Sequence, residues 1–367
     1  MSGALGFALN VAGIVAPLAL MGKPVPKPSL ASTNVQIIVG HAPGDNENND
    51  PSELGGGCPH VALWDDFGER IGQYSPSKGC RVHTNNVGEV WNIEHKQTVP
   101  SMSQADPYYV MLSTTSKNAI CISAISVVGQ KIQGNFFGDI GSMCGMTWFL
   151  SDNAIGSDFS KPRCVWLDAD HSNGINARAL SFHLNDMVPN PDKTEEYQQD
   201  MDMLCKSTPR FSFWGDLLPD GRIPFFKPPL QYTGDNGADI DRSRVLDDPN
   251  HPYNKGASMR RRSTLKARRE ENKGSNHDVT QLIVSESDDV REVCEHPNSY
   301  GWDIVSKKQS LFCCMEHKQL YPLCTPAITD RCFDLDAKTL RSVTDMHAEE
   351  AKHMRFGRSY NSTRHWK

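Results

Sequence analysis

The chain of 367 residues is long enough for one large domain or two smaller ones with a substantial hydrophobic core. Its formal net charge of -6, from 38 basic and 44 acidic side chains, excludes a general attraction to nucleic acid or anionic lipid, which needs a basic field. Hydrophobic residues make up only 38%, and Gly and Pro number 28 and 23, a composition that favours a loop-rich β protein over a helical bundle.

Residues 1–33 contain an apolar leader followed by a Pro-rich linker. Residues 3–22 carry no charge, and we expect them to be a secretory signal whose cleavage point lies near Ala16, Leu18 and Ala19. Two alternatives stay open, a helix that packs on the domain and a helix that inserts in a membrane. They stay open because the basic residues that usually precede the apolar part of a signal are absent.

Residues 34–215 are expected to form a β-rich domain. Short apolar or alternating runs bounded by turn residues predict strands at 34–40, 60–64, 69–73, 108–113, 119–128, 163–168 and 179–184. The sequence Asp-Asp-Phe-Gly at 65–68 predicts a hairpin, because Asp favours turns and Gly tolerates positive φ. Strands without alternating helices predict a mainly β fold: an antiparallel β-sandwich or jelly roll with a few short helices and long loops.

Two of these strands make sharper predictions. The run at 119–128 is apolar on both alternating faces, so we expect it in the middle of two packed layers. At 179–184 the apolar Leu180 and Phe182 alternate with Ser181 and His183. We therefore expect His183 to face solvent or a polar layer.

Residues 216–275 are predicted to be an Arg-rich linker or surface loop. The stretch 255–273 holds eight basic and two acidic residues and no aromatic side chain that could stack on bases. A solvated loop is the simplest interpretation. Inside a cell such a cluster could act as a localisation signal, whereas in the secretory pathway Arg262 and Arg269 would end dibasic sites open to proteolytic processing.

Residues 276–340 form a Cys-rich segment that we expect to pack on the β domain. A strand is predicted at 279–285, followed by a short helix with Ser287 as its N-cap. Residues 341–367 are predicted to be a C-terminal helix, at 345–355, and a polar tail. In that tail, Asn361 begins an Asn-Ser-Thr triplet, which is a glycosylation acceptor in an exported chain.

The eleven cysteines predict disulfide bonds and, because their number is odd, at least one thiol that is free or paired with another chain. Their pairing cannot be read from the spacing. A zinc site is disfavoured, because the adjacent Cys313 and Cys314 and the wide gaps elsewhere lack the short paired spacing of zinc knuckles.

Oxygen ligands for Ca²⁺ gather at Asp168, Asp170 and Asn173, directly after a predicted strand. The spacing departs from that of an EF-hand loop, and the same residues are those that turns require. A plain polar turn is therefore the favoured interpretation, with Ca²⁺ as the alternative.

No catalytic residue can be assigned from the sequence. Ser142, in Gly-Ser-Met-Cys-Gly, stands one position too early for a nucleophile elbow. A carbohydrate-active hydrolase needs only two suitably spaced carboxylates, which the 44 acidic residues neither exclude nor locate.

Several motifs resemble an uncharacterised family of cysteine-containing, predicted secreted proteins of filamentous ascomycete fungi. The resemblance covers about residues 61–340 and rests on AICISAISV, GDIGSMCG, CVWLDADHSNGI, DMLCKSTPRF, LFCCMEHKQLYPLC and TDRCFDLD. It implies a fungal origin and a secreted β-rich domain, and it transfers no catalytic residue. The doubled Cys313-Cys314 and the long Arg-rich insert depart from the family pattern.

The sequence therefore predicts a secreted, disulfide-stabilised glycoprotein that binds an extracellular protein or carbohydrate, with host or cell-wall material as the candidate target. It predicts no nucleic-acid partner and no cofactor other than Ca²⁺. The alternatives are a carbohydrate-active hydrolase and, with the leader retained, a membrane-active protein.

Overall fold

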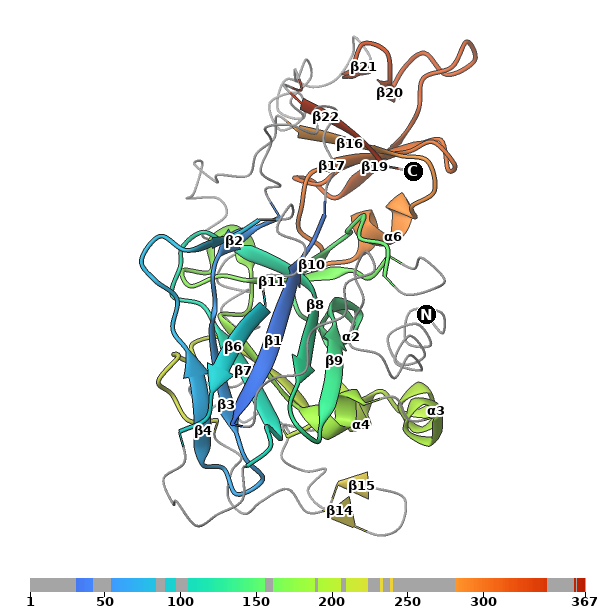
Figure 1. Ribbon diagram of the computed structural model, residues 1–367. Coiled ribbons are helices and arrows are strands. Elements are labelled where there is room, and N and C mark those ends of the chain that lie inside the picture. Colours follow the sequence, from blue (N-terminus) through green and yellow to red (C-terminus); the bar gives the residue numbers. More distant parts are fainter. Residues whose placement is uncertain are drawn as a thin grey trace. The chain divides into compact units, whose positions relative to one another are not determined.

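The computed structural model describes residues 31–41, 54–83, 90–96, 105–155, 161–188, 191–205, 209–223, 232–233, 238–239, 281–341, 360 and 362–366. The chain divides into two compact units. The first comprises Met1–His41 and Glu53–Gly274, and the second comprises Ala42–Ser52 and Ser275–Lys367. Figure 1 shows the elements of both units.

The first unit contains a six-stranded antiparallel sheet built around the long strand β8. The strand order is β10-β11-β8-β1-β6, and β9 also pairs with β8. The bounds are β1 (Ser32–Val39), β6 (Val90–Glu94), β8 (Ile120–Val128), β9 (Gln133–Phe137), β10 (Trp148–Phe149) and β11 (Cys164–Leu167). All nine residues of β8 are buried, which confirms the prediction of a strand covered on both faces.

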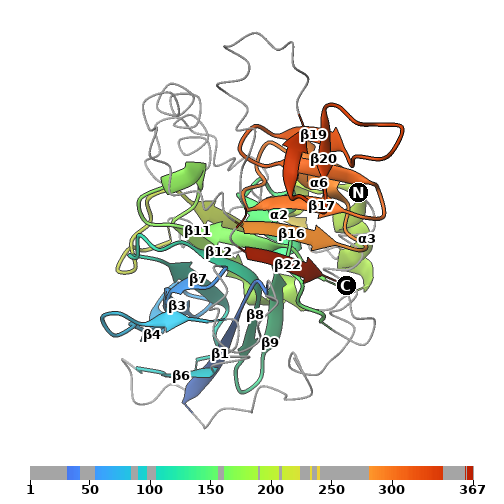
Figure 2. The ribbon, with the colours of Figure 1, turned by 90° about the horizontal axis from the view of Figure 1, so that it is seen from above.

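A second antiparallel sheet of five strands has the order β13-β12-β7-β3-β4. Figure 2 labels four of its strands, β12, β7, β3 and β4. Its strands are β3 (His60–Trp64), β4 (Arg70–Tyr74), β7 (Tyr109–Ser113), β12 (Ala179–His183) and β13 (Phe211–Trp214). The predicted hairpin between β3 and β4 is confirmed. Asp65 Oδ1 accepts the backbone N–H groups of Phe67 and Glu69, each at 2.9 Å, and Gly68 has the positive φ of 79° that favours glycine.

Aromatic side chains join the inner faces of the two sheets. The ring of Phe136 on β9 stacks on Phe182 of β12 and on Phe211 of β13, with centroid distances of 5.5 and 5.4 Å. The outer face of the five-stranded sheet is also covered, because Leu217 and Ile223 pack into the cluster of its buried residues. The first unit is thus the mainly β, sandwich-like fold that the sequence predicts.

Helices of the first unit are few and short. They are α2 (Gly138–Met143), α3 (Pro191–Gln199), α4 (Asp202–Cys205) and the 3-10 turns η2 (Ser172–Gly174) and η3 (Leu184–Met187). Two-stranded pairs are formed by β2 (Gly56–Gly57) with β5 (Arg81–Val82) and by β14 (Tyr232–Thr233) with β15 (Ala238–Asp239). No helix in the described part of the chain is both long and apolar enough to cross a bilayer.

The second unit is built on a mixed sheet with the order β19-β18-β17-β16-β22. Its elements are β16 (Gln281–Ser285), α6 (Val290–Glu295), β17 (Asp303–Ser306), β18 (Leu311–Cys314), β19 (Gln319–Pro322), β20 (Cys332–Asp334), β21 (Thr339–Arg341) and β22 (Ser362–Trp366). Strand β16 runs parallel to both β17 and β22, while the other pairs are antiparallel. Leu282, Val284, Val305, Phe312 and Phe333 form its hydrophobic cluster.

Ten of the eleven cysteines form five disulfides, and Cys314 belongs to none of them. The pairs are Cys58–Cys80, Cys121–Cys164 and Cys144–Cys205 in the first unit, and Cys294–Cys313 and Cys324–Cys332 in the second. Each unit is therefore cross-linked within itself. This confirms the prediction of a disulfide-stabilised chain in which one cysteine of the odd number lies outside the disulfides.

Helix α6 corrects one local prediction. Its N-cap is Asp289, whose side chain accepts the N–H groups of Arg291 and Glu292, and not the exposed Ser287. The helix expected at 345–355 lies outside the described residues, as does all of the leader up to residue 30. Most of the predicted linker 216–275, with all of the basic stretch 255–273, also lies outside them. Its first residues, up to Ile223, are instead packed in the first unit, where the prediction had placed a linker or surface loop.

Candidate functional site

The connection between β11 and β12, residues 168–178, gathers several charged side chains at one end of the sandwich. Its base is fixed by two backbone hydrogen bonds, from Asp168 N–H to the Ala177 carbonyl at 2.9 Å and from Ala169 N–H to the Ser116 carbonyl at 3.1 Å. We call residues 168–178, with Asp216 beside them, the polar turn.

Two carboxyl groups of the polar turn are oriented by one serine. Ser172 Oγ donates to Asp168 Oδ2 at 2.7 Å, and Ser172 N–H donates to Asp170 Oδ1 at 3.1 Å. Burial raises the pKa of Asp168 to about 6, and the neighbouring carboxyl of Asp170 adds to the rise. Partial burial alone would raise the pKa of Asp170, but the neighbouring carboxyl of Asp168 and the hydrogen bonds from Ser172 lower it.

The backbone of the polar turn holds two non-glycine residues in the left-handed region. His171 has a φ of 56° and Asn173 a φ of 58°, and Gly174 follows with 76°. Such conformations cost free energy for residues with a Cβ and are concentrated at functional sites. The turn is thus held in a strained shape by the strands on either side.

His171 and Arg178 complete the polar turn. The Nδ1 atom of His171 lies 2.9 Å from the Ile175 carbonyl, which makes Nδ1 the donor, and its Nε2 atom lies 3.7 Å from Asp216 Oδ1. The guanidinium of Arg178 donates from Nη2 to the Ala169 carbonyl. Both side chains are only half-buried, so the outer rim of the turn is accessible to solvent.

Three buried polar atoms of the polar turn make no hydrogen bond within the described part of the chain: Asp168 Oδ1, His171 Nε2 and Arg178 Nε. Buried polar groups are almost always satisfied, so a cluster of such atoms indicates a place for water, an ion or a ligand. The set combines one donor, Arg178 Nε, with two acceptors, Asp168 Oδ1 and the second nitrogen of a neutral His171 ring. It is therefore suited to hydroxyl groups, which both donate and accept.

The structure brings together two of the three predicted Ca²⁺ ligands. Asp168 and Asp170 both accept hydrogen bonds from Ser172, and Asn173 lies on the same turn in η2. Among the described residues, no group of three or more His, Cys, Asp or Glu side chains has the geometry of a metal site. The predicted glycosylation residue Asn361 and the predicted processing residues Arg262 and Arg269 lie outside the described residues.

Ser142 occupies a structural position in helix α2. Its Oγ donates to the Asp139 carbonyl at 2.9 Å, and the nearby Cys144 is bonded to Cys205. The weak match to a nucleophile elbow is thus explained by helix and disulfide geometry.

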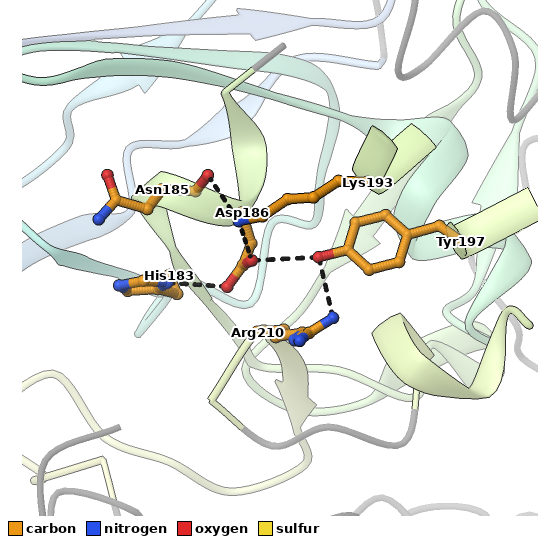
Figure 3. Close-up of polar contacts among 6 residues, drawn as sticks. All are labelled: His183, Asn185, Asp186, Lys193, Tyr197 and Arg210. Carbon is orange, nitrogen blue, oxygen red and sulfur yellow. Dashed lines mark hydrogen bonds and ion pairs between the residues drawn. The ribbon is translucent and has the colours of Figure 1, made fainter. Parts of the chain in front are cut away.

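A second polar cluster, which the sequence analysis did not predict, is buried at the opposite end of β12 (Figure 3). Asp186 in η3 is bonded through Oδ2 to His183 Nδ1 at 2.8 Å. Its Oδ1 accepts from Lys193 Nζ at 2.8 Å and from Tyr197 Oη at 3.1 Å. Arg210 then donates to Tyr197 Oη at 3.2 Å and stacks over the tyrosine ring.

This buried cluster is electrostatically balanced around Asp186. Burial alone would raise the pKa of Asp186, but the hydrogen bond from His183 and the charges of His183, Lys193 and Arg210 lower it below its usual range. Burial, together with the nearby Asp186, raises the pKa of Tyr197. His183, Asp186 and Arg210 are at most 2% exposed, so we assign the cluster to stabilising the end of the sandwich.

The position of His183 decides between the two predicted environments, solvent and a polar layer. Its ring lies 4.8 Å from that of Tyr109 and faces Asp186 inside the protein, so it belongs to a buried polar layer and not to the surface. Sequence reasoning missed the cluster because its residues are spread over 28 positions, from His183 to Arg210, on three elements and an irregular segment.

Comparisons of the chain with protein-family models, curated proteins and solved structures found no match.

Proposed function

We propose that the chain is an exported, disulfide-stabilised binding protein of a filamentous fungus. Five disulfides in two separately cross-linked units support export, because disulfides persist in oxidising compartments and are rare in the cytosol. The fungal origin comes from the family resemblance. The uncharged segment at 3–22 supplies the signal that export requires.

The proposed binding site is the polar turn, and the proposed ligand is a carbohydrate of host or cell-wall material. The observation that carries this proposal is the cluster of three unsatisfied polar atoms, which belong to Asp168, His171 and Arg178. Sugar hydroxyls can accept from Arg178 Nε and donate to Asp168 Oδ1 and to His171 Nε2, which is the acceptor nitrogen of a neutral imidazole whose Nδ1 donates. The strained backbone supports the proposal, since it presents the turn in one preorganised shape.

The carboxyl geometry favours binding over glycoside hydrolysis at this place. Retaining and inverting glycosidases hold their two carboxyl groups about 5–5.5 Å or about 6.5–9.5 Å apart, with the sugar between them. Asp168 and Asp170 instead both accept hydrogen bonds from Ser172, so that one residue holds the two carboxyl groups next to each other. A hydrolase would therefore have to use other carboxylates, and that alternative function remains without located residues.

Replacing His171 by asparagine, which tolerates the left-handed backbone, is expected to weaken carbohydrate binding by about tenfold, or about 1.4 kcal/mol. The measurement is binding of the full chain to a panel of soluble fungal and plant cell-wall polysaccharides by isothermal calorimetry. His317→Asn changes an exposed histidine outside the site and is the matched control. Absence of binding to the whole panel, or equal affinity of His171→Asn and the wild type, would overturn the proposal.

Mass spectrometry of the protein isolated from the medium of its native host tests export. We expect the mature chain to lack about 22 N-terminal residues, a length typical of secretory signals. We also expect glycan on Asn361 and a fraction of chains cut after Arg262 or Arg269, because dibasic sequences are processed in the secretory pathway. A chain found only inside cells, with its N-terminus intact, contradicts export.

A further inference from the structure

The hairpin between β3 and β4 carries the most exposed large hydrophobic side chain among the described residues. Phe67 is 74% exposed, compared with 48% for Leu218 and 41% for Ile328. Single exposed apolar residues are common on protein surfaces and need no explanation by themselves. Phe67 differs from such residues because the backbone that carries it is held in one shape.

The loop after β13 braces this hairpin. Arg222 donates from Nη2 to the Gly68 carbonyl at 2.9 Å, and Arg70 donates from Nη2 to the Gly221 carbonyl at 2.8 Å. We call residues 65–70, which this loop supports, the hairpin end. An aromatic side chain on a rigid support loses little conformational freedom on binding, and such residues are typical anchors of protein interfaces.

The surroundings of Phe67 are acidic. The hairpin end and the bracing turn at 218–222 together contain four acidic and two basic side chains. Among the described residues Asp66 has no ion pair, and Glu69 stays 71% exposed although it lies 3.6 Å from Arg222. Both arginines direct a donor to a backbone carbonyl of the opposite loop. The accessible charge beside the aromatic ring is therefore mainly negative.

Tyr108 reports the same negative field. Burial raises the pKa of its hydroxyl, and the carboxylates of Asp66 and Asp106 raise it further. Asp66 directly precedes Phe67 in the sequence. The carboxylates of two different loops thus act on one side of the hairpin end.

The hairpin end is distinct from the proposed carbohydrate site. Strand β3 ends at Trp64, opposite Tyr109 of β7, whereas β12 leaves the polar turn at Ala179, opposite Ser113 of β7. The hairpin end and the polar turn therefore lie at opposite ends of the five-stranded sheet. A ligand at one of them leaves the other accessible.

We propose that the hairpin end is a docking surface for a cationic amphipathic segment of a partner protein. Apolar side chains of that segment cover the Phe67 ring, and its Lys or Arg side chains lie against the carboxylates of Asp66 and Glu69. The same carboxylates disfavour an anionic membrane, the other surface that an exposed aromatic side chain could enter. The inference does not depend on the identity of the carbohydrate ligand.

A fluorescently labelled amphipathic helix of lysine and leucine is the probe, and its anisotropy on titration with the full chain measures binding. We expect saturable binding that weakens as salt is added, because exposed charges are screened. Phe67→Ser should weaken binding about tenfold or more, as for a residue that anchors an interface. Asp66→Asn should weaken it several-fold and reduce its salt dependence. Phe67→Trp keeps an aromatic ring and should bind as the wild type does.

Ile328→Ser is the matched control, because it removes an exposed apolar side chain in the second unit. It should leave binding of the peptide unchanged. The inference is overturned if the wild type does not bind the peptide, or if Phe67→Ser binds it as tightly as Ile328→Ser. Binding of the wild type to anionic lipid vesicles, or its self-association, would also overturn the inference if Phe67→Ser abolished it, because the surface would then belong to a membrane or to a second copy of the chain.

Discussion

Replacing both Cys121 and Cys164 by alanine is expected to lower the free energy of unfolding by about 4 kcal/mol. The two residues are fully buried on β8 and β11, and their disulfide closes a loop with a sequence separation of 43. Breaking it lets the unfolded chain regain the conformational freedom that the loop removes. Urea denaturation of the double variant and the wild type, followed by tryptophan fluorescence, measures the difference.

The other cysteines provide graded controls for this result. The Cys58–Cys80 disulfide has a separation of 22, so its removal should cost less, about 3 kcal/mol. Cys314→Ala removes a thiol that is in no disulfide, and we expect a change below about 1 kcal/mol. Thiol titration of the unfolded, unreduced protein should find one thiol. Eleven thiols, or a double variant as stable as the wild type, would show that the cross-links do not form.

Eight strands were predicted because each carries its own local pattern, whereas others, such as β6, β9 and β13, were not. The run Ile120–Val128 is apolar on both faces, and a strand of that kind can only lie between two layers. The pairing partners were not predictable. Strand β16 pairs with β22, with Gln281 opposite Ser362, and nothing in either segment encodes a partner so distant in sequence. The parallel pairs of the second unit were missed for the same reason.

The candidate site was predictable only where its residues are neighbours in sequence. Asp168 and Asp170 stand out because two acidic residues follow the end of a strand, where turns also require them. Asp216, which lies beside His171, belongs to a loop after β13 that is distant from the polar turn in sequence. His183 was assigned to one face of an alternating strand. Its burial comes from contacts with η3 and α3. The alternation of side chains along a strand carries no information about such contacts.

Asp186→Asn is expected to destabilise the first unit by about 3–5 kcal/mol, as is usual when one member of a buried charge network is removed. The substitution preserves shape but deletes the charge that acts on His183, Lys193 and Arg210. Those groups then remain buried or half-buried without their common carboxylate. Thermal and urea unfolding of the variant and the wild type at neutral pH give the difference.

Tyr197→Phe separates the charge from the hydrogen bonds of the same cluster. It keeps the ring on which Arg210 stacks and removes only the hydroxyl between Arg210 and Asp186. A loss of about 1–2 kcal/mol is expected, smaller than that of Asp186→Asn, because one hydrogen-bonding group is lost and no charge. Equal losses in the two variants would mean that the carboxylate charge adds nothing to stability.

The pH dependence of the unfolding free energy of Asp186→Asn separates the electrostatic effect of the buried cluster from the effect of its packing. The folded protein holds the pKa of Asp186 below its unfolded value of about 3.9, so the carboxylate stabilises the fold fully above that pH. This contribution is lost as the pH falls through the folded pKa and the carboxylate takes up a proton. The difference in unfolding free energy between wild type and Asp186→Asn should therefore be largest near pH 6 and shrink below about pH 4. If this difference stayed constant down to pH 2, the destabilisation by Asp186→Asn would come from altered packing and not from the lost charge.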